Sequence, residues 1–514
     1  MNDKIKQLTE LEKRLMEGGG ARSIQKQHES GKLTARERLD RFFDKGSFQE
    51  TGLHVKHRAT NFGMDKTEIP ADGVITGFGT VNGRTVCAYA QDFTARGGTL
   101  GEMHAKKICA IMDMAMKIKA PMIGFIDSGG ARIQEGIASL DGYSNIFFRN
   151  SAASGVIPQI SAIMGPAAGG AVYSPAMTDF IFMVKKTSYM FITGSGVVKT
   201  VTGEEIDNET LGGAMTHAMR SGVAQFACNT DEEAIDEIKN LLTYLPSSNE
   251  ETPPVIETGD APYREVPELD SILPESASKG YDMKKVIKAI ADNGECMEVS
   301  RQWAQNIITA FGRMNGHVVG FIANQPQFLA GCLDINASDK ATRFIRFCDA
   351  FNIPLVTIAD VPGFLPGSHQ EFGGIIRHGA KLLWCYAEAT VPKITLITRK
   401  AYGGAYIAMC SRGLGADYTL AWPQAEIAVM GAEAAADVIF SKEIKAAPDP
   451  EAKRQEVIEN YRETLYNPYV AAGLGYIDAV IKPAETRAKI VAALEALEAK
   501  QEERPWKKHG NIPM

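Results

Sequence analysis

Two stretches decide the fold: VITGFGTVNG at residues 74–83 and IITAFGRMNG at residues 307–316. Each is a predicted β-hairpin, because it is rich in β-branched and aromatic residues and ends in Asn-Gly, the dipeptide preferred in a type I′ turn. The two stretches are 233 residues apart, and the same offset relates PMIGFID (121–127) to PLVTIAD (354–360). This collinear series of matches predicts two diverged copies of one α/β domain.

The match continues through a second buried strand in each half. IPQISAIMGPAAGGAVYSP (157–175) aligns with VPKITLITRKAYGGAYIAM (391–409) at an offset of 234, so one residue has been inserted between the matching blocks. A helical stretch separates the hairpin from the first buried strand in both halves. Each half is therefore predicted to run hairpin, helix, buried strand, turn, helix, buried strand, turn, helix.

Length and local composition give the domain boundaries. A chain of 514 residues is too long for one hydrophobic core. The proline-rich, acidic stretch 252–283 is predicted to be a linker between an N-terminal domain, 1–251, and a C-terminal domain, 284–514. The first 50 residues alternate charged and apolar positions at helical spacing and are predicted to form a helical extension that packs on a partner or on the main body.

Composition excludes several classes of function. The formal net charge of −7 leaves no broad basic field for nucleic acid. The eight cysteines contain no C-x-x-C pair and the nine histidines no H-E-x-x-H pattern, so reduced thiols and no metal site are expected. We found no apolar run long enough to span a membrane. A cytoplasmic protein is predicted, in contact with the inner face of the membrane only through a partner complex.

The chemistry is predicted to lie in glycine-rich turns that follow the buried strands. These turns are DSGGARIQEG (127–136) and GPAAGGAVYSP (165–175) in the first half, and DVPGFLPGSHQEFGG (360–374) and KAYGGAYIAM (400–409) in the second. Glycine lets the backbone approach a ligand closely, and free amides at the start of a helix favour an oxyanion. A single Gly-Gly-Ala turn is more simply explained by tight packing, but two equivalent turns in duplicated domains favour a function.

A reaction that needs two oxyanion pockets and few side chains is carboxyl transfer. Carbon–carbon bond formation next to a thioester passes through an enolate, which backbone amides stabilise selectively. A second pocket of the same design would hold the ureido oxygen of biotin while its ring nitrogen gains or loses a carboxyl group. The sequence therefore favours a carboxyltransferase with one pocket in each half.

Further motifs make this hypothesis specific, among them ARERLDRFFDKGSF, KTVTGEE, AWPQAEIAVMGAE and the terminal RPWKKHGNIPM. Together with the turns, they resemble the biotin-dependent acyl-CoA carboxyltransferase family over nearly the whole chain. This family includes the propionyl-CoA carboxylase β and methylmalonyl-CoA decarboxylase α subunits. The resemblance implies two tandem crotonase-like domains and a homo-hexamer of two stacked trimers. It also implies that acyl-CoA binds the N-terminal domain of one subunit and biotin the C-terminal domain of another.

The resemblance also implies site residues, motif by motif. The pocket for the acyl-thioester oxygen would be formed by Gly169, Gly170 and Ala171, beside a CoA-binding turn of Ser128, Gly129, Gly130, Ala131 and Arg132. The biotin carbonyl would be held by Gly403, Gly404 and Ala405. The approach to biotin would be lined by Val361, Pro362, Gly363, Phe364, Tyr406 and Ile407.

Some features leave the activity open within this class. Ile407 stands where propionyl-CoA carboxylases usually carry Asp, and GSG (194–196) stands where relatives often have a proline and an acidic residue. Propionyl-CoA and methylmalonyl-CoA are the first expectation for the substrate. The alternatives are carboxylation of acetyl-CoA and decarboxylation in a sodium-pumping complex. A non-catalytic acyl-CoA-binding scaffold is the alternative from another class.

Partners are predicted from what the sequence lacks. Lys117 lies in AMKI, which resembles a biotin-attachment tetrad, but it is placed mid-helix, so biotin is expected on a separate carrier protein. No nucleotide-binding loop is present, so a biotin carboxylase or a membrane decarboxylase subunit is the expected partner.

Four side chains admit alternative roles. Arg132 and Lys107 are candidates for CoA phosphate contacts, with a solvated face as the alternative. Ser128 is predicted to cap a helix rather than to act as a nucleophile. His378 is predicted to be packed and hydrogen-bonded.

Overall fold

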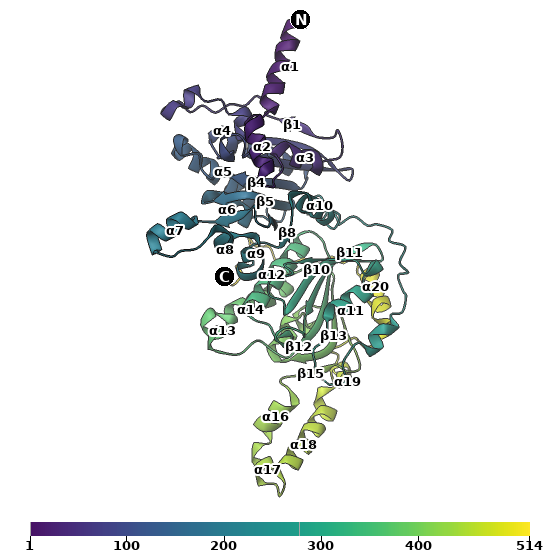
Figure 1. Cartoon of the computed structure of the whole chain (residues 1–514). Helices are drawn as coiled ribbons and strands as arrows, with labels where there is room; N and C mark the ends of the chain where they lie inside the picture. Colours follow the sequence, from purple (N-terminus) through teal and green to yellow (C-terminus); the bar gives the residue numbers. More distant parts are fainter. Residues whose placement is uncertain (1, 277) are drawn as a thin grey trace. The chain divides into compact units, whose positions relative to one another are not determined.

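The computed structural model of the chain describes residues 2–276 and 278–514, and it divides into two compact units that meet at Thr252 and Pro253 (Figure 1). This boundary coincides with the start of the predicted linker. The stretch 252–283 is nevertheless not a free linker, because Val266, Leu269 and Tyr281 are buried in the core of the second unit. The linker prediction is therefore corrected: residues 253–283 belong to the second unit, and these three side chains anchor them in its core.

The first unit contains one eight-stranded sheet in the order β1-β2-β3-β4-β5-β6-β8, with β7 paired to the end of β5. The strands are β1 (Gln49–Thr51), β2 (Val74–Val81), β3 (Arg84–Gln91), β4 (Met122–Ser128), β5 (Gln159–Ala168), β6 (Phe180–Val184), β7 (Tyr189–Phe191) and β8 (Phe226–Cys228). The strands from β3 to β8 pair in parallel, which requires crossover connections.

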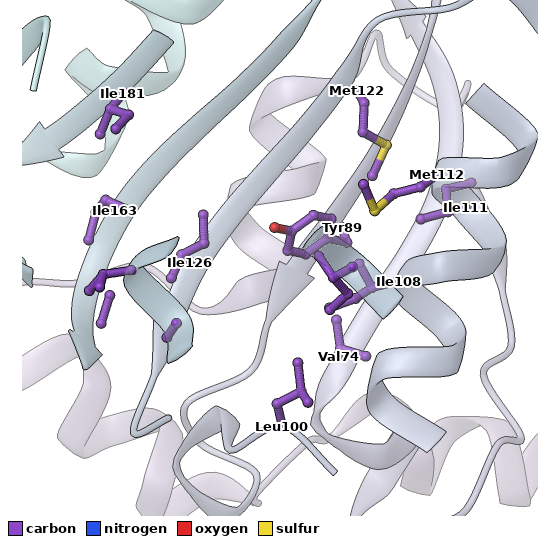
Figure 2. Packing of buried hydrophobic residues seen from close by; sticks show 14 of the residues in the cluster. Val74, Tyr89, Leu100, Ile108, Ile111, Met112, Met122, Ile126, Ile163 and Ile181 are labelled. Carbon is purple, nitrogen blue, oxygen red and sulfur yellow. The ribbon is translucent and has the colours of Figure 1, made fainter. Parts of the chain in front are cut away.

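Helices supply these crossovers and the N-terminal extension. They are α1 (Asn2–Met16), α2 (Ala21–Glu29), α3 (Ala35–Phe42), α4 (Glu102–Ile118), α5 (Ile137–Ala153), α6 (Gly170–Ala176), α7 (Ser195–Thr202), α8 (Asn208–Gly212), α9 (Ala214–Thr216) and α10 (Asp231–Leu242). Figure 2 shows Ile108, Ile111 and Met112 of α4 packing toward the sheet residues Val74, Tyr89 and Met122. The buried face of α4 and the strands form the core that holds the carboxyl ends of β4 and β5 in place.

The second unit repeats this architecture in an eight-stranded sheet of order β16-β14-β13-β12-β11-β10-β9, with β15 paired to β13. Its strands are β9 (Cys296–Val299), β10 (Ile307–Met314), β11 (His317–Asn324), β12 (Leu355–Val361), β13 (Lys393–Tyr402), β14 (Tyr418–Ala421), β15 (Glu426–Ala428) and β16 (Ala479–Val480). Its helices are α11 (Met283–Ile290), α12 (Ile335–Ala350), α13 (Ser368–Gly373), α14 (Ile375–Glu388), α15 (Gly403–Ala408), α16 (Ala432–Ile439), α17 (Ser441–Ala446), α18 (Pro450–Tyr461), α19 (Pro468–Gly473) and α20 (Thr486–Ala496).

The two units share strand register as well as strand order. In the β2–β3 hairpin Val74 pairs with Gln91, and in the β10–β11 hairpin Ile307 pairs with Asn324, at the offset predicted from the sequence. Both Asn-Gly turns have positive φ at both residues, 51° and 77° in the first hairpin and 52° and 78° in the second. The predicted type I′ geometry and the duplicated α/β fold are therefore confirmed.

The one-residue insertion lies between the first and second buried strands. Met122 of β4 pairs with Gln159 of β5, whereas the equivalent Leu355 of β12 pairs with Lys393 of β13, one residue further along the chain. In this interval the first unit has the single helix α5, and the second has α13 and α14, which meet at Gly374 with φ 87°. The insertion is thus absorbed where the helical layer is broken, and the strands keep their register.

A buried lysine occupies the same place in each unit. The amine of Lys107 donates to the carbonyls of Ala71 and Val74, and that of Lys340, 233 residues later, donates to the carbonyls of Trp303 and Ile307. Each lysine therefore satisfies backbone groups at the start of the hairpin. Burial lowers the pKa of Lys107 to about 8 and that of Lys340 to about 7.

These shifts predict a pH dependence of stability. Because the pKa of Lys340 is lower in the folded than in the unfolded chain, the unfolded state binds more protons between about pH 7 and 10, and stability rises with pH in this window. In this window Lys340 increases the free energy of unfolding by about 1 kcal/mol per pH unit. Urea unfolding of wild type and Lys340→Met at pH 7, 8 and 9 measures it. The free energy of unfolding of wild type should rise by that amount per pH unit relative to Lys340→Met. Parallel pH profiles of the two proteins would contradict the lowered pKa of Lys340.

Candidate active site

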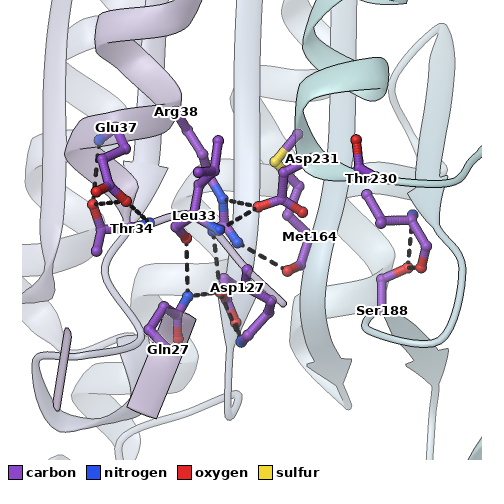
Figure 3. Close-up of polar contacts among 12 residues, drawn as sticks. Gln27, Leu33, Thr34, Glu37, Arg38, Asp127, Met164, Ser188, Thr230 and Asp231 are labelled. Atoms are coloured by element: carbon purple, nitrogen blue, oxygen red, sulfur yellow. Dashed lines mark hydrogen bonds and ion pairs between the residues drawn. The ribbon is translucent and has the colours of Figure 1, made fainter. Parts of the chain in front are cut away.

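A buried carboxylate marks the point where the first central strand ends in each unit. In the first unit Asp127 lies at a register shift between β4 and β5, and its side chain is fully buried. It accepts hydrogen bonds from the amine of Lys32 at 3.0 Å, from the guanidinium of Arg38 at 3.0 Å and from Gln27 at 2.9 Å (Figure 3). These cations come from the N-terminal extension, which therefore packs on the main body rather than only on a partner.

Arg38 connects this cluster to the rest of the unit. Its guanidinium also pairs with Asp231 at 2.8 Å and donates to the carbonyl of Met164 in β5 at 3.0 Å. The helix that carries it, α3, begins with a capping box in which Thr34 and Glu37 satisfy each other's backbone amides. The charges of Lys32 and Arg38 thus face those of Asp127 and Asp231 in the interior, and each of the four groups makes at least one hydrogen bond.

In the second unit the buried carboxylate is neutralised by a cation from the neighbouring strand. Asp360 lies at the equivalent register shift between β12 and β13, and Arg399 of β13 pairs with it at 3.0 Å. The position equivalent to Arg399 in the first unit is Gly165. A Cβ atom there would lie 1.8 Å from an Asp127 carboxylate oxygen, so only glycine leaves room for the imported cations.

The turn after β4 is held by its own backbone. Ser128 is buried, and its hydroxyl donates to the carbonyl of Gly98 at 2.7 Å and accepts from the amide of Gly130 at 3.1 Å. Ser128 therefore braces the turn and does not cap a helix, which corrects that prediction. The amide of Gly129 donates to the carbonyl of Gly97 at 2.9 Å. Among the residues the structure describes, the amide of Ala131 donates no hydrogen bond.

Arg132 and Lys107 are placed differently from the two alternatives that the sequence offered. The side chain of Arg132 is 1% exposed and pairs with Asp72 at 2.6 Å and Glu135 at 2.7 Å. Both cations are buried, so neither forms a solvated face nor has its charge available to CoA phosphates. Burial fixes Arg132 as a brace under the predicted CoA-binding turn.

The Gly-Gly-Ala turn of the first unit supplies two free donors rather than three. Gly169 adopts φ 58°, which favours glycine, and its amide is committed to the carbonyl of Phe191 in β7 at 3.2 Å. The prediction that the Gly169 amide is a free donor is therefore corrected, and Gly169 instead provides the positive φ of the turn. The amides of Gly170 and Ala171 begin α6 and have no hydrogen-bond partner within the described ranges 2–276 and 278–514.

The two turns of the first unit are neighbours. A Cβ atom on Gly130 would lie 3.1 Å from the carbonyl oxygen of Ala168, and Ser128 pairs with Ala167 across β4 and β5. The free amide of Ala131 and those of Gly170 and Ala171 therefore belong to adjoining turns at one edge of the sheet. From its sequence, Ala131 is expected only in the CoA-binding turn; the signal for its free amide is its position after the glycine pair Gly129 and Gly130.

The second unit reproduces this arrangement. Leu333 donates its amide to the carbonyl of Gly363, as Leu100 does to Gly130, and Phe364 takes the place of Ala131. Gly403 has φ 56°, matching Gly169. In the part of the chain that the structure describes, the amides of Phe364, Gly404 and Ala405 donate no hydrogen bond.

The surroundings of the two donor sets differ. A Cβ atom on Gly170 would lie 3.0 Å from the Tyr143 ring, whereas one on Gly404 would have no atom within 4 Å. Tyr406 and Ile407 follow on α15, and the side chain of Ile407 is 45% exposed. Because α6 has seven residues and α15 six, the positive potential comes from the turn amides rather than from a long helix.

The donors that the structure describes at these sites are backbone amides. His378 is hydrogen-bonded to Asp339 at 2.8 Å, as the sequence predicted. No cluster of three or more metal-ligating side chains occurs among residues 2–276 and 278–514. None of the described helices is long and apolar enough to cross a bilayer. The arrangement in each unit is suited to stabilising a negative oxygen at the ends of the central strands.

Comparison with known proteins gives consistent matches over the full length. A family model described as the carboxyl transferase domain matches residues 26–512. The methylmalonyl-CoA decarboxylase subunit alpha of Propionigenium modestum is 59% identical over 511 residues, covering 99% of each chain. The propionyl-CoA carboxylase carboxyltransferase subunit of Haloferax mediterranei is 56% identical, covering 100% of each. A crystal structure of transcarboxylase 12S, described as a hexamer with methylmalonyl-coenzyme A and methylmalonic acid bound, has a TM-score of 0.98 at 54% identity and covers 100% of this chain and 98% of that one.

The network around Asp127 yields a stability prediction. Asp127→Asn removes the charge that compensates Lys32 and Arg38 in the interior, and the loss of one partner of a buried ion pair costs about 3–5 kcal/mol. Urea unfolding should show a destabilisation of this size. The matched control is Asp236→Asn, which breaks the exposed pair with Arg41 and should cost less than about 1 kcal/mol. Equal effects of the two substitutions would show that the buried network does not stabilise the first unit.

Proposed function

We infer the activity from one premise: the chain belongs to the carboxyl transferase family. We propose that it transfers a carboxyl group between biotin, carried on a separate protein, and the α-carbon of a short acyl-CoA, with propionyl-CoA and methylmalonyl-CoA as the substrate pair. The observation that carries this proposal is the duplicated set of free backbone amides at the strand ends of the two units. Relatives with 54–59% identity named for these two substrates support the acyl group.

The first unit is proposed to bind the acyl-CoA. Its free amides, from Ala131, Gly170 and Ala171, would donate to the thioester oxygen, whose negative charge grows as the α-carbon becomes an enolate. These donors are fixed before the reaction, so they favour the charged state without reorganisation. The turn Ser128–Arg132 would contact CoA through its backbone, while the side chain of Arg132 holds the turn from below.

The second unit is proposed to bind biotin, which supplies the nitrogen that carries the carboxyl group. The amides of Phe364, Gly404 and Ala405 would donate to the ureido oxygen of the biotin ring. The absence of any atom within 4 Å of a Cβ built on Gly404 supports this fit, because a planar ring can reach the amide there. Val361, Pro362, Gly363, Tyr406 and Ile407 are proposed to line the approach.

Each catalytic centre is proposed to form between two copies of the chain in a homo-hexamer. Large apolar side chains are exposed on the helices next to the donor turns, among them Tyr173 on α6, and Phe372, Ile376 and Ile407 on α13, α14 and α15. Such surfaces are typical of protein–protein interfaces. We further propose that a biotin carrier protein reaches this interface and that a biotin carboxylase or a membrane decarboxylase subunit works with it.

The donor role of Gly404 can be tested by removing its N–H. Gly404→Pro removes the N–H at the start of α15, where proline is compatible with a helix. Loss of one donor to a developing oxyanion should lower kcat by about 10²- to 10³-fold. The assay is decarboxylation of methylmalonyl-CoA by the purified protein with free biotin as acceptor.

Gly404→Ala is the comparison variant, because it keeps the amide but places a methyl group in the space that the biotin ring would use. Its KM for biotin should rise, while its kcat should stay within about threefold of wild type, since the N–H donor remains. Size-exclusion chromatography checks that both variants keep the wild-type assembly. Full activity of Gly404→Pro would rule out this amide as a donor, and CoA binding without any biotin-dependent turnover in wild type would favour a non-catalytic scaffold.

A second assay tests the acyl group. With free biotin, the protein is expected to decarboxylate methylmalonyl-CoA with a kcat/KM at least about tenfold above that for malonyl-CoA, the discrimination that one methyl group in a pocket can give. A preference for malonyl-CoA would instead indicate acetyl-CoA carboxylation.

A further inference from the structure

The last residue of β13, Tyr402, lies directly before the donor turn of the second unit. It precedes Gly403 and pairs with Ala428 of β15. Its side chain is 8% exposed, and its hydroxyl donates to the carboxylate of Glu426, two residues earlier on β15. The hydrogen bond from Tyr402 to Glu426 therefore joins β15 to β13, the strand that the donor turn follows.

Strand β15 reaches the turn in a second way. The carbonyl oxygen of Val429, the residue after β15, lies 2.9 Å from where a Cβ on Gly403 would be. Any slip of β15 against β13 would therefore move the backbone at Gly403 and redirect the amides that follow. The bond from Tyr402 to Glu426 opposes such a slip, because both residues lie on the interacting strands.

Tyr402 is also a member of a small core outside the main one. This core contains Tyr402, Ala432, Ala436, Ile444, Val457, Ile458 and Tyr466, most of which lie on the helices α16–α18 that Figure 1 shows extending from the sheet of the second unit. The rings of Tyr402 and Tyr466 have centroids 5.4 Å apart, and the Tyr466 hydroxyl accepts from the amide of Ala432 at the start of α16. Tyr402 thus connects the donor turn to the helical arm α16–α18.

The first unit has nothing equivalent at this place. The residue before Gly169 is Ala168, which pairs with Phe191 of β7. The nearby Tyr189 uses its hydroxyl for the carbonyl of Lys186 in its own loop, at 2.8 Å. The bond between Tyr402 and Glu426, here called the clamp, is therefore a feature of the second unit, although Gly169 and Gly403 have matching φ angles.

We propose that Tyr402 and Glu426 are positioning residues that fix the direction of the Gly404 and Ala405 amides by locking β15 to β13, with Tyr466 holding the same point to the arm α16–α18. The proposal rests on the proposed function for its catalytic consequence, since it assigns the clamp to the biotin side alone. Loosening the clamp should impair the use of biotin and leave the binding of acyl-CoA unchanged. Tyr402→Phe is the direct test, because it removes the hydroxyl and keeps the ring in the core of the arm.

Kinetics of the full-length protein give the first readout. In the decarboxylation assay with free biotin, Tyr402→Phe and Glu426→Ala should each lower kcat/KM for biotin by about tenfold or more, the effect of losing a hydrogen bond to a charged group. The KM for methylmalonyl-CoA should stay within about twofold of wild type. Glu426→Gln keeps an oxygen that can accept from Tyr402 and should restore most of the activity. Tyr189→Phe in the first unit is the control hydroxyl deletion and should leave both constants unchanged.

Amide hydrogen exchange gives a readout that does not depend on activity. In Tyr402→Phe the peptide covering 400–410 should exchange about tenfold faster, while the peptide covering 166–176 keeps its wild-type rate. A wild-type exchange rate at 400–410 would overturn the positioning role, and so would equal losses in kcat/KM for biotin and acyl-CoA or a failure of Glu426→Gln to restore activity. Faster exchange at 400–410 in a protein without biotin-dependent turnover would sustain the clamp and refute the proposed function instead.

Discussion

A carboxylate buried at the end of a central strand must be neutralised, and both units are built around this requirement. Asp127 and Asp360 lie at equivalent register shifts, and both are almost completely removed from solvent. An unpaired charge there would cost several kcal/mol, so a cation has to be supplied. The second unit supplies Arg399 from its neighbouring strand, whereas the first has Gly165 at that place and takes Lys32 and Arg38 from the N-terminal segment. The N-terminal extension is therefore part of the interior of the first unit.

The need to neutralise these carboxylates also affects the donor turns, because the aspartates lie on the backbone directly before them. The register shift and the paired aspartate hold the ends of the two central strands, and the turns that follow carry amides without internal partners. Because these donors are peptide groups, their positions depend on strand register and turn conformation rather than on the identity of their own side chains. The positive φ of Gly169 and Gly403 is the local requirement that glycine alone meets easily. The geometry of the donor turns and the stability of the fold thus depend on the same contacts.

The sequence predicted what depends on periodicity and on backbone conformation. The hairpins with their Asn-Gly turns at Asn82 and Asn315, the offset between the halves and the order of hairpin, helices and buried strands along each half followed from such patterns. Long-range pairing was not predictable: the cations for Asp127 are about 90 residues away in the chain, and nothing local indicates that Arg132 faces Asp72. The partner of the Gly169 amide, Phe191, lies on the short strand β7, which pairs with the end of β5. In the segment 252–283, prolines and acidic residues obscure the few apolar side chains that are buried, so the sequence alone predicts a linker there.

Duplication leaves a problem of discrimination that the backbone cannot solve. Two donor turns with matching φ angles at Gly169 and Gly403 and donor amides at equivalent positions offer the same kind of N–H group to any negative oxygen, so they cannot by themselves distinguish a thioester from a ureido group. The distinction has to come from what surrounds each turn. In the first unit Tyr143 packs against Gly170 and narrows the space beside it, whereas in the second the space at Gly404 is open. In our proposal the bond from Tyr402 to Glu426 adds rigidity beside this open space, whereas Ala168, at the equivalent place before the packed turn, carries no side-chain group that could make such a bond.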